Sequence, residues 1–198
     1  IRGLLAALLA GEHVLLLGPV GTAKSMLAVE LCERLEGGHY FGWLLTRFST
    51  PEELYGAISL KALEDDRYVR VTSGKLPEAH IAFLDEIFKA NSAILNTLLT
   101  LLNEREFDNG TTREKTPLAA VIGASNELPE GPELEALHDR FLLRLHVGPV
   151  SSDGFPALLG LRGESVPEVP AGAPLTEDDL AAVQRAAAQV EVPDDVVA

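Results

Sequence analysis

The chain has 198 residues, of which 46% are hydrophobic and 23% charged, and its formal net charge is −14. This composition is that of a globular protein with one substantial core, and no apolar run approaches the roughly 18 to 20 residues of a membrane span. The acidic balance disfavours direct nucleic-acid binding through a broad basic surface. One cysteine, Cys32, excludes an internal disulfide and is expected to be buried, and residues 1–10 lack a signal-peptide pattern, so we expect a cytoplasmic protein.

The first elements are predicted to be a helix, a buried strand and a second helix. Residues 1–10 place apolar side chains at helical spacing and end at Gly11. Residues 14–17 are apolar without alternation, which is typical of a central strand covered on both faces. A helix is predicted over residues 23–35, so that a strand, a tight loop and a helix follow one another.

The loop between this strand and helix is close to the phosphate-binding pattern G-x-x-x-x-G-K-[ST]. It reads Gly18-Pro19-Val20-Gly21-Thr22-Ala23-Lys24-Ser25. Lys24 would supply a point charge to the β- and γ-phosphates, and Ser25 a hydroxyl for Mg²⁺. Ala23 replaces the second glycine, and its Cβ is tolerable only if φ is negative or slightly strained. The alternative is a glycine-rich turn with a surface lysine.

The next stretch is less regular. Residues 43–48 are predicted to form a second strand, and Ser49-Thr50-Pro51-Glu52-Glu53 has the capping residues of a short helix start. In the irregular segment 57–75, residues 58–60 and 68–71 resemble two short strands separated by charged residues. We interpret this segment as an inserted hairpin or strand-turn unit.

A second functional signal follows the buried strand predicted over residues 81–84, because that strand ends in Asp85 and Glu86. Ligands of open α/β sheets bind at the carboxyl ends of strands. In a P-loop NTPase the first acid helps to hold Mg²⁺, and an acid beside it can orient the attacking water. The alternative is a solvated pair of acids that opens a loop.

A third signal lies at the end of another buried strand. Asn91 is expected to cap a helix, residues 106–115 read as a hairpin around Asp108-Asn109-Gly110, and residues 118–124 form a strand that ends near Asn126. The Asn126 amide could hydrogen-bond the γ-phosphate and the attacking water, although asparagine is also a common turn former.

Two arginines form the fourth signal. A short helix is predicted over residues 133–139 and a last strand over 141–147, and Arg140 and Arg144 lie near the start of that strand. A guanidinium suits the phosphate charge of a transition state because it stays protonated. Either arginine could instead pair with Asp139 or a nearby glutamate.

The composition changes after residue 150. Four prolines and several glycines within residues 151–174 indicate a linker, with at most a short helix over 155–161. A helix is predicted over residues 180–190, and Pro193 looks like the start of another.

Together the four signals resemble an AAA+ ATPase, and their details resemble the RavA-like branch of the MoxR family. The resemblance covers nearly the whole chain and rests on GPVGTAKS, the segment 49–106, GASNELP and LHDRF. It implies a three-layer α/β/α fold with a five-stranded, mainly parallel sheet. Residues 1–150 would form the nucleotide-binding core, and residues 151–198 a linker and a truncated helical lid.

The resemblance also assigns roles. Lys24 and Ser25 would belong to Walker A, Asp85 and Glu86 to Walker B, Asn126 to sensor 1, and Arg140 would be the arginine finger. Ser25 and Asp85 would serve Mg²⁺ through nucleotide and water. The segment 57–75 would be the insertion in helix 2, and residues 106–115 the hairpin before sensor 1. The sensor 2 arginine of the family would lie beyond Ala198.

The expected function is therefore Mg²⁺-dependent ATP hydrolysis by a homo-oligomeric, hexameric ring that remodels an unidentified protein client. The alternative is a nucleotide-dependent scaffold or switch that binds ATP and barely turns it over. Ala23 and the missing part of the lid favour that alternative for this stretch of chain. Glu86, Asn126 and Arg140 favour the enzyme.

Overall fold

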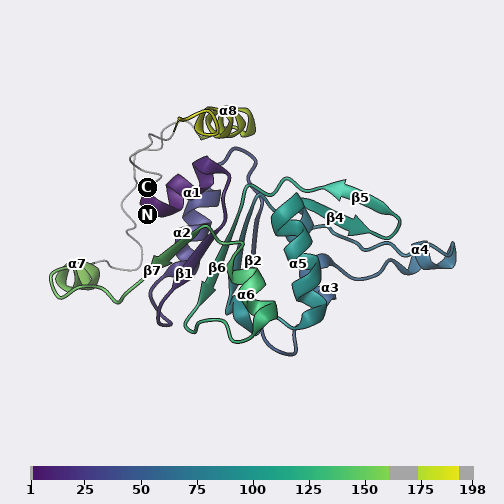
Figure 1. Ribbon diagram of the computed structural model, residues 1–198, viewed down its shortest axis with the longest axis horizontal. Coiled ribbons are helices and arrows are strands. Elements are labelled where there is room, and N and C mark those ends of the chain that lie inside the picture. Colours follow the sequence, from purple (N-terminus) through teal and green to yellow (C-terminus); the bar gives the residue numbers. More distant parts are fainter. Residues whose placement is uncertain (1, 161–173, 192–198) are drawn as a thin grey trace.

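The fold is built on one parallel sheet. The computed structural model describes residues 2–160 and 174–191. Within them, five strands lie in the order β2 (Tyr40–Leu44), β3 (Ile81–Asp85), β6 (Ala120–Ser125), β1 (Val14–Leu17) and β7 (Leu143–His146), each parallel to its neighbours. Helices cover both faces of the sheet (Figure 1). The expected three-layer α/β/α architecture with a five-stranded parallel sheet is confirmed.

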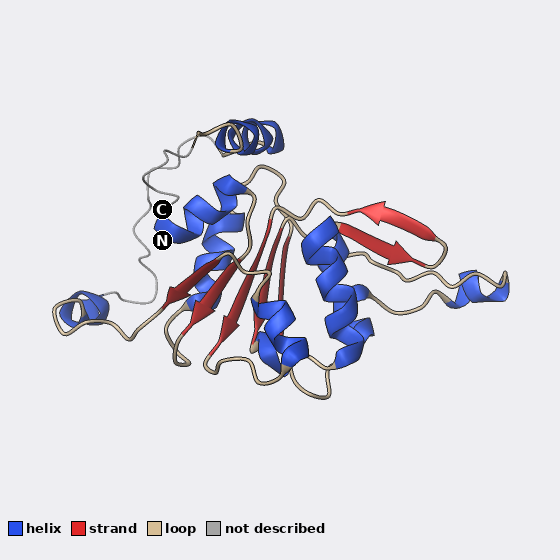
Figure 2. Ribbon diagram, in the orientation of Figure 1, coloured by secondary structure: helices blue, strands red, loops and turns tan. Residues whose placement is uncertain are grey.

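The apolar strands bury side chains on both faces, which explains their lack of alternation. Leu16 packs with α1 (Arg2–Ala10) and α2 (Lys24–Cys32), whereas its neighbour Leu15 packs with α3 (Pro51–Tyr55), α5 (Ser92–Glu104) and α6 (Pro132–His138). Figure 2 shows these two layers on either side of the strands. Cys32 is buried in the first layer, as expected, and burial raises the pKa of its thiol.

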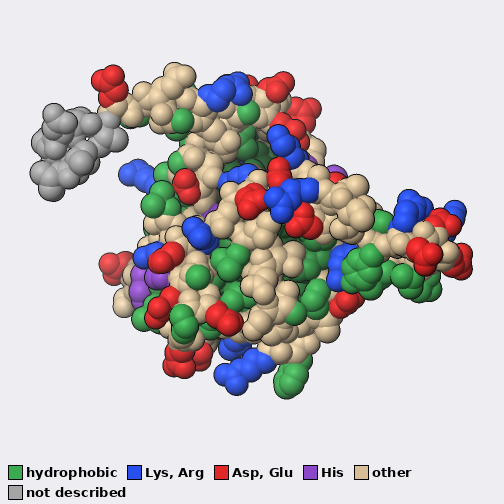
Figure 3. Space-filling view, turned by 45° about the vertical axis from the view of Figure 1, so that its right-hand side comes forward, with side chains coloured by type: hydrophobic (Ala, Val, Ile, Leu, Met, Phe, Trp, Pro, Cys, Tyr) green, Lys and Arg blue, Asp and Glu red, His purple; other side chains and the backbone are tan. Residues whose placement is uncertain are grey.

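Two segments project from the second layer. One is an arm of residues 57–71 that carries α4 (Leu60–Glu64), and the other is the hairpin of β4 (Glu106–Asn109) and β5 (Thr112–Lys115) (Figure 1). The hairpin agrees with the sequence prediction. The arm exposes apolar side chains among charged ones, visible at the right of Figure 3, namely Leu60, Leu63, Tyr68 and Val71.

The arm contains less strand than predicted. Ile58 and Arg70 form a single antiparallel bridge, and a helix occupies the position expected for part of the first strand. The helix forms because the Ser59 hydroxyl accepts the Ala62 N–H over 3.2 Å and so caps α4.

The second strand also differs from its prediction, since β2 spans Tyr40–Leu44 instead of residues 43–48. The chain turns after Leu45 because Thr46 and Ser49 hold each other. The Thr46 N–H donates to the Ser49 hydroxyl over 3.0 Å, and the Ser49 N–H donates to the Thr46 carbonyl over 3.1 Å. This turn leads directly into the capping box of Thr50 and Glu53 at the start of α3.

Beyond β7 the structure describes α7 (Phe155–Gly160) and α8 (Glu177–Ala187). The second helix starts three residues before its predicted first residue, at a capping box of Thr176 and Asp179. It docks beside α1, where Leu180 is buried and the Gln184 amide donates to the Leu8 carbonyl over 3.0 Å. The helix start predicted at Pro193 lies outside the described residues. None of the helices in the described ranges has the length and apolarity needed to cross a membrane.

Candidate nucleotide-binding site

The phosphate loop, residues 18–25, runs from the carboxyl end of β1 into α2. The first residue of the loop, Gly18, is tightly packed against neighbouring backbone. The Gly18 N–H donates to the Ser125 carbonyl over 3.0 Å, and a Cβ on Gly18 would stand 2.0 Å from the Val147 carbonyl oxygen. A side chain at residue 18 would therefore displace the backbone that follows β7, so this glycine is required by packing.

Ala23 adopts a left-handed backbone conformation, with φ 58° and ψ 29°. A residue with a Cβ in this conformation is destabilised by about 1 kcal/mol. Of the two possibilities for Ala23, a negative φ or a strained backbone, the structure has the strained backbone. Ala23 is also the N-cap of α2, and its side chain offers no capping hydrogen bond. The first N–H groups of α2 thus have no side-chain acceptor from the cap and remain available to an anion.

The Lys24 side chain folds back into the loop and is only 8% exposed. Its Nζ donates to the carbonyl oxygens of Gly18 over 3.0 Å and of Pro19 over 2.8 Å. An ammonium has three N–H groups, so one remains for a phosphate oxygen. Ser25 follows in the first turn of α2 and is exposed beside this charge.

Asp85 and Ser25 belong to the same layer of the fold. Ile81 and Phe83 of β3 pack with α1 and α2, whereas Ala82 and Leu84 pack with α3, α5 and α6. Successive side chains of a strand point to opposite faces, so Asp85 continues the first set toward the layer of α2. A carboxylate and a hydroxyl are oxygen ligands that Mg²⁺ accepts, so these two residues fit a nucleotide-bound Mg²⁺.

Glu86 leaves the strand in a left-handed conformation, with φ 53° and ψ 44°. Such strained residues concentrate at functional sites. Its N–H donates to Asp85 Oδ1 over 3.1 Å, and its Oε2 lies 3.3 Å from Lys89 Nζ. The side chain of Glu86 is only 12% exposed.

Asn126 joins the same edge of the sheet. The register pairs Leu17 with Ser125, so Asn126 follows β6 beside the start of the phosphate loop, and it is exposed there. The buried Ser125 hydroxyl shapes the turn after it, because it donates to the Glu127 carbonyl over 2.8 Å and accepts the Glu127 N–H over 3.1 Å. Lys24, Asp85, Glu86 and Asn126 therefore lie together at the carboxyl edge of the sheet.

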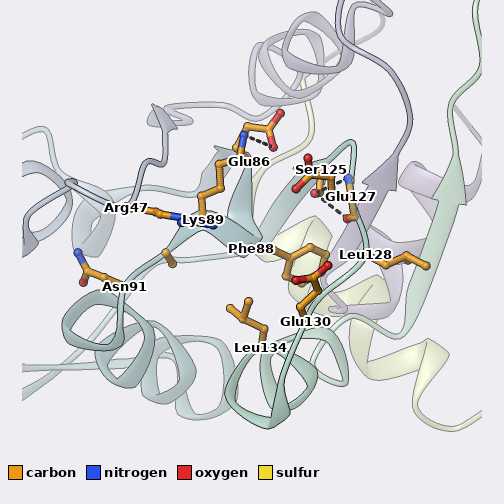
Figure 4. A pocket seen from close by; sticks show the side chains of 11 residues that line it. Arg47, Glu86, Phe88, Lys89, Asn91, Ser125, Glu127, Leu128, Glu130 and Leu134 are labelled. Atoms are coloured by element: carbon orange, nitrogen blue, oxygen red, sulfur yellow. Dashed lines mark hydrogen bonds and ion pairs between the residues drawn. The ribbon is translucent and has the colours of Figure 1, made fainter.

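A cavity of about 270 Å³ opens beside Glu86 (Figure 4). It is bounded by Leu134 of α6 and by segments after β2, β3 and β6, and no residue of the loop 18–25 lines it. Its two cationic lining residues, Arg47 and Lys89, were not among the predicted site residues. The signal for Lys89 was present as a basic residue three positions after an acid, whereas Arg47 reaches the cavity only because β2 ends early.

Arg140 lies at the opposite edge of the sheet. Leu143 at the start of β7 pairs with Val14 at the start of β1, whereas the phosphate loop follows the end of β1. A rise of about 3.3 Å per residue separates the two edges by about 10 Å along β1. Arg140 is exposed and, among the described residues, has no ion-pair partner, whereas Arg144 Nη2 lies 3.5 Å from Asp139 Oδ1. The structure thus does not bring Arg140 to the loop of its own chain.

Solved structures share this fold. A candidate ATPase of Cytophaga hutchinsonii superposes with a TM-score of 0.69 at 16% identity, covering 98% of this chain and 58% of the other. NtrX of Brucella abortus in complex with ADP superposes with a TM-score of 0.59 at 16% identity, covering 80% of this chain and 37% of the other. At these identities the likeness establishes the fold alone.

Sequence comparison with known proteins establishes the family. Two uncharacterised proteins of Methanocaldococcus jannaschii are similar, one 46% identical over 95% of this chain and the other 55% identical over 71%. The chain spans 50% and 37% of their lengths, respectively. A family model for the MoxR domain of MoxR–vWA–β-propeller ternary systems matches residues 1–184. The chain therefore belongs to the bpMoxR family.

Proposed function

We propose that this AAA+ core binds ATP with Mg²⁺ and hydrolyses its γ-phosphate. The observation that carries the proposal is that Lys24, Asp85, Glu86 and Asn126 lie at the same edge of the sheet as the phosphate loop. A lysine in the loop, two acids after a strand and an amide after the adjacent strand are the groups that phosphoryl transfer to water requires.

Each residue has a distinct role in this proposal. Residues 18–25 surround the phosphates, and the remaining Lys24 N–H binds the β- and γ-phosphates. Ser25 and Asp85 hold Mg²⁺, which neutralises phosphate charge when it is bound. Glu86 orients the attacking water, and Asn126 hydrogen-bonds that water and the γ-phosphate.

The whole protein is proposed to work as a homo-oligomeric, hexameric ring in the cytoplasm, with Arg140 acting on the nucleotide of a neighbouring subunit. Support comes from the position of Arg140 at the edge opposite the phosphate loop. The family description names vWA and β-propeller components of a ternary system. We therefore propose that the protein partners remodelled by this ATPase carry those domains. We also propose that the protein belongs to the RavA-like branch and that it has no nucleic-acid partner. In this proposal the nucleotide-binding core ends at residue 150, and the linker and lid follow it.

A second function, a nucleotide-dependent scaffold or switch with little turnover, is favoured by two observations. Ala23 strains the phosphate loop, and Lys89 engages the carboxylate of Glu86. Both features are compatible with tight nucleotide binding and slow hydrolysis.

Two variants of the full-length protein separate these functions. Lys24→Ala removes a cation from a triphosphate site, so ATP affinity measured by calorimetry should fall at least tenfold, about 1.4 kcal/mol. Glu86→Gln keeps the shape but loses the charge, so it should bind ATP and lose turnover. Lys61→Ala on the exposed arm is the matched control and should change neither quantity. Unchanged affinity in Lys24→Ala would exclude the phosphate-loop assignment, and parental turnover in Glu86→Gln would exclude its catalytic role.

A further inference from the structure

The cavity beside Glu86 contains a cation that the proposed function does not use. Arg47 lines this cavity and, among the described residues, has no ion-pair partner. We propose that the cavity is a subsite for the orthophosphate ion released by hydrolysis and that Arg47 binds this ion. The inference rests on the proposed ATP hydrolysis, and it assigns a role to a residue outside the phosphate loop.

The chemistry of hydrolysis directs the phosphate toward this cavity. The attacking water forms a bond to the γ-phosphorus while the bond to the ADP oxygen breaks, and the released proton passes to solvent. In this in-line displacement the phosphoryl group moves away from ADP and toward the water. Glu86, which orients that water in the proposed function, lines the cavity. The cavity therefore lies ahead of the departing phosphate, while ADP blocks the way back.

The cavity also adjoins the phosphate loop. Ser125 lines the cavity, and the Ser125 carbonyl accepts the Gly18 N–H over 3.0 Å at the start of that loop. The cavity volume of about 270 Å³ lies below the usual range of about 300 to 1,000 Å³ for ligand pockets. A small ion therefore fits this cavity better than a second nucleotide.

Arg47 is held in place by its neighbours. The Thr46 N–H donates to the Ser49 hydroxyl over 3.0 Å, and the Phe48 N–H donates to the Thr46 hydroxyl over 3.2 Å. The Asn91 amide donates to the Ser49 carbonyl over 2.7 Å, which joins this turn to the start of α5. The backbone on both sides of Arg47 is therefore fixed relative to the cavity.

The charges of the cavity favour an anion on the side of Arg47. Figure 4 shows Arg47 and Lys89 on one side of the cavity and Glu127 and Glu130 on the other. Lys89 Nζ already lies 3.3 Å from the Glu86 carboxylate, so Arg47 supplies the uncompensated positive charge of its side. A guanidinium matches phosphate because its planar fork donates two parallel hydrogen bonds. The acids on the opposite side keep binding weak enough for a product to leave.

Inhibition of the full-length ATPase by added inorganic phosphate tests the subsite. Phosphate bound in the cavity of the ADP complex should still inhibit at saturating ATP, whereas phosphate in an empty phosphate loop is displaced by ATP. Arg47→Gln should raise the phosphate inhibition constant at saturating ATP about tenfold, the lower end for loss of a charge-assisted hydrogen bond, because Arg47 is exposed. Arg47→Lys should raise this constant less, since it retains the charge and loses only the fork.

The matched control is Arg67→Gln, which changes an exposed arginine of the arm and should leave the inhibition constant unchanged. Two results would overturn the subsite. One is inhibition that ATP relieves completely, and the other is an equal inhibition constant in Arg47→Gln and the parental protein.

Thermal midpoints test phosphate binding without turnover. Phosphate added to the ADP-saturated parental protein should raise the midpoint further, because a bound ligand stabilises the folded state, and Arg47→Gln should lose most of this further rise. The general salt effect of phosphate acts on both proteins and cancels in the comparison. If ADP alone raises neither midpoint, the proposed function fails. If ADP raises both midpoints and phosphate adds the same rise to both, or none, only the phosphate subsite is wrong.

Discussion

His13 is a buried titratable residue at the start of β1. Its Nδ1 accepts the Val121 N–H over 3.0 Å, so Nε2 carries the proton and donates to the Leu102 carbonyl over 3.0 Å. Burial, with the charge of Arg105 as a smaller cause, lowers the pKa of His13 from 6.5 to about 4. The imidazole therefore makes both hydrogen bonds, to Leu102 of α5 and Val121 of β6, only in its neutral form.

The depressed pKa predicts a loss of stability in mild acid. Below pH 6.5 His13 becomes protonated in the unfolded chain but stays neutral in the folded protein. The free energy of unfolding therefore falls between pH 6.5 and about 4. A shift of this size corresponds to about 3 kcal/mol over the whole window. Urea unfolding at pH 7.5, 6.0 and 5.0 should reveal this decline. His13→Gln should have a flatter profile over this window than the control His146→Gln, which changes an exposed histidine, and equal slopes would contradict the assignment.

The roles of some residues could be predicted from the sequence, and those of others could not. The loop 18–25 and the acids after β3 were identifiable because strand, loop and helix follow one another within a short stretch. The contacts of His13 join residues 89 and 108 positions apart, and no local pattern encodes them. The left-handed conformation of Glu86 had no signal in the sequence, because residues with a Cβ rarely adopt it.

Among the elements, the arm and the hairpin are joined by one buried amide. The Arg70 N–H donates to Asn109 Oδ1 over 2.7 Å, and Asn109 Nδ2 donates to the Arg70 carbonyl over 3.3 Å. At the hairpin turn, a Cβ on Gly110 would stand 2.0 Å from the Tyr68 carbonyl oxygen. The two projecting segments therefore form one unit, and the sequence predicted the hairpin turn without predicting what the turn binds.

Asn109→Ala should release the arm from the hairpin. The substitution leaves the Arg70 N–H and carbonyl without their partner, which costs about 1 to 3 kcal/mol. We expect faster amide hydrogen exchange at Arg70 and in the following residue, with unchanged exchange in α2. Asn103→Ala, at an exposed position of the neighbouring helix, is the control. Parental protection of the Arg70 amide in Asn109→Ala would show that other contacts hold the arm.

The misassigned elements have a common physical reason. In the arm, the β-branched and aromatic residues favour strands, but the Ser59 cap stabilises a helix and the partner of Arg70 lies 39 positions away. In β2, apolar residues continue past the last ladder position, but Thr46 and Ser49 close a turn. Local hydrogen bonds of side chains with the backbone therefore overrode the hydrophobic pattern in both places.

For the whole molecule, the order of alternating strands and helices was enough to predict a parallel sheet with two covered faces. Right-handed crossovers then place the carboxyl ends of β1, β3 and β6 at one edge, which is why the first three signals could be interpreted as one site. The docking of α8 beside α1 could not be predicted, because it depends on long-range contacts such as the one between Gln184 and Leu8.

The position of Arg140 leads to a prediction about assembly. Because it lies at the edge opposite the phosphate loop of its own chain, a role in hydrolysis requires a second subunit. An arginine supplied in trans contributes on the order of 10³ to 10⁵ in rate in other NTPases. Arg140→Ala should therefore retain ATP affinity and lose most of its turnover, whereas Arg144→Ala, whose guanidinium pairs with Asp139, should lose much less.

Mixing two inactive variants tests whether the site is shared. Arg140→Ala subunits have an intact phosphate loop, and Lys24→Ala subunits have an intact arginine, so a mixed oligomer contains some boundaries with both. Full-length protein mixed in equal amounts should regain part of the parental ATPase rate, because each such boundary restores one complete site. The control mixes Arg140→Ala with an Arg140→Ala, Lys24→Ala double variant, which has no complete boundary. If mixed oligomers form and remain inactive, or if isolated monomers hydrolyse ATP at the full rate, Arg140 does not act across the subunit boundary.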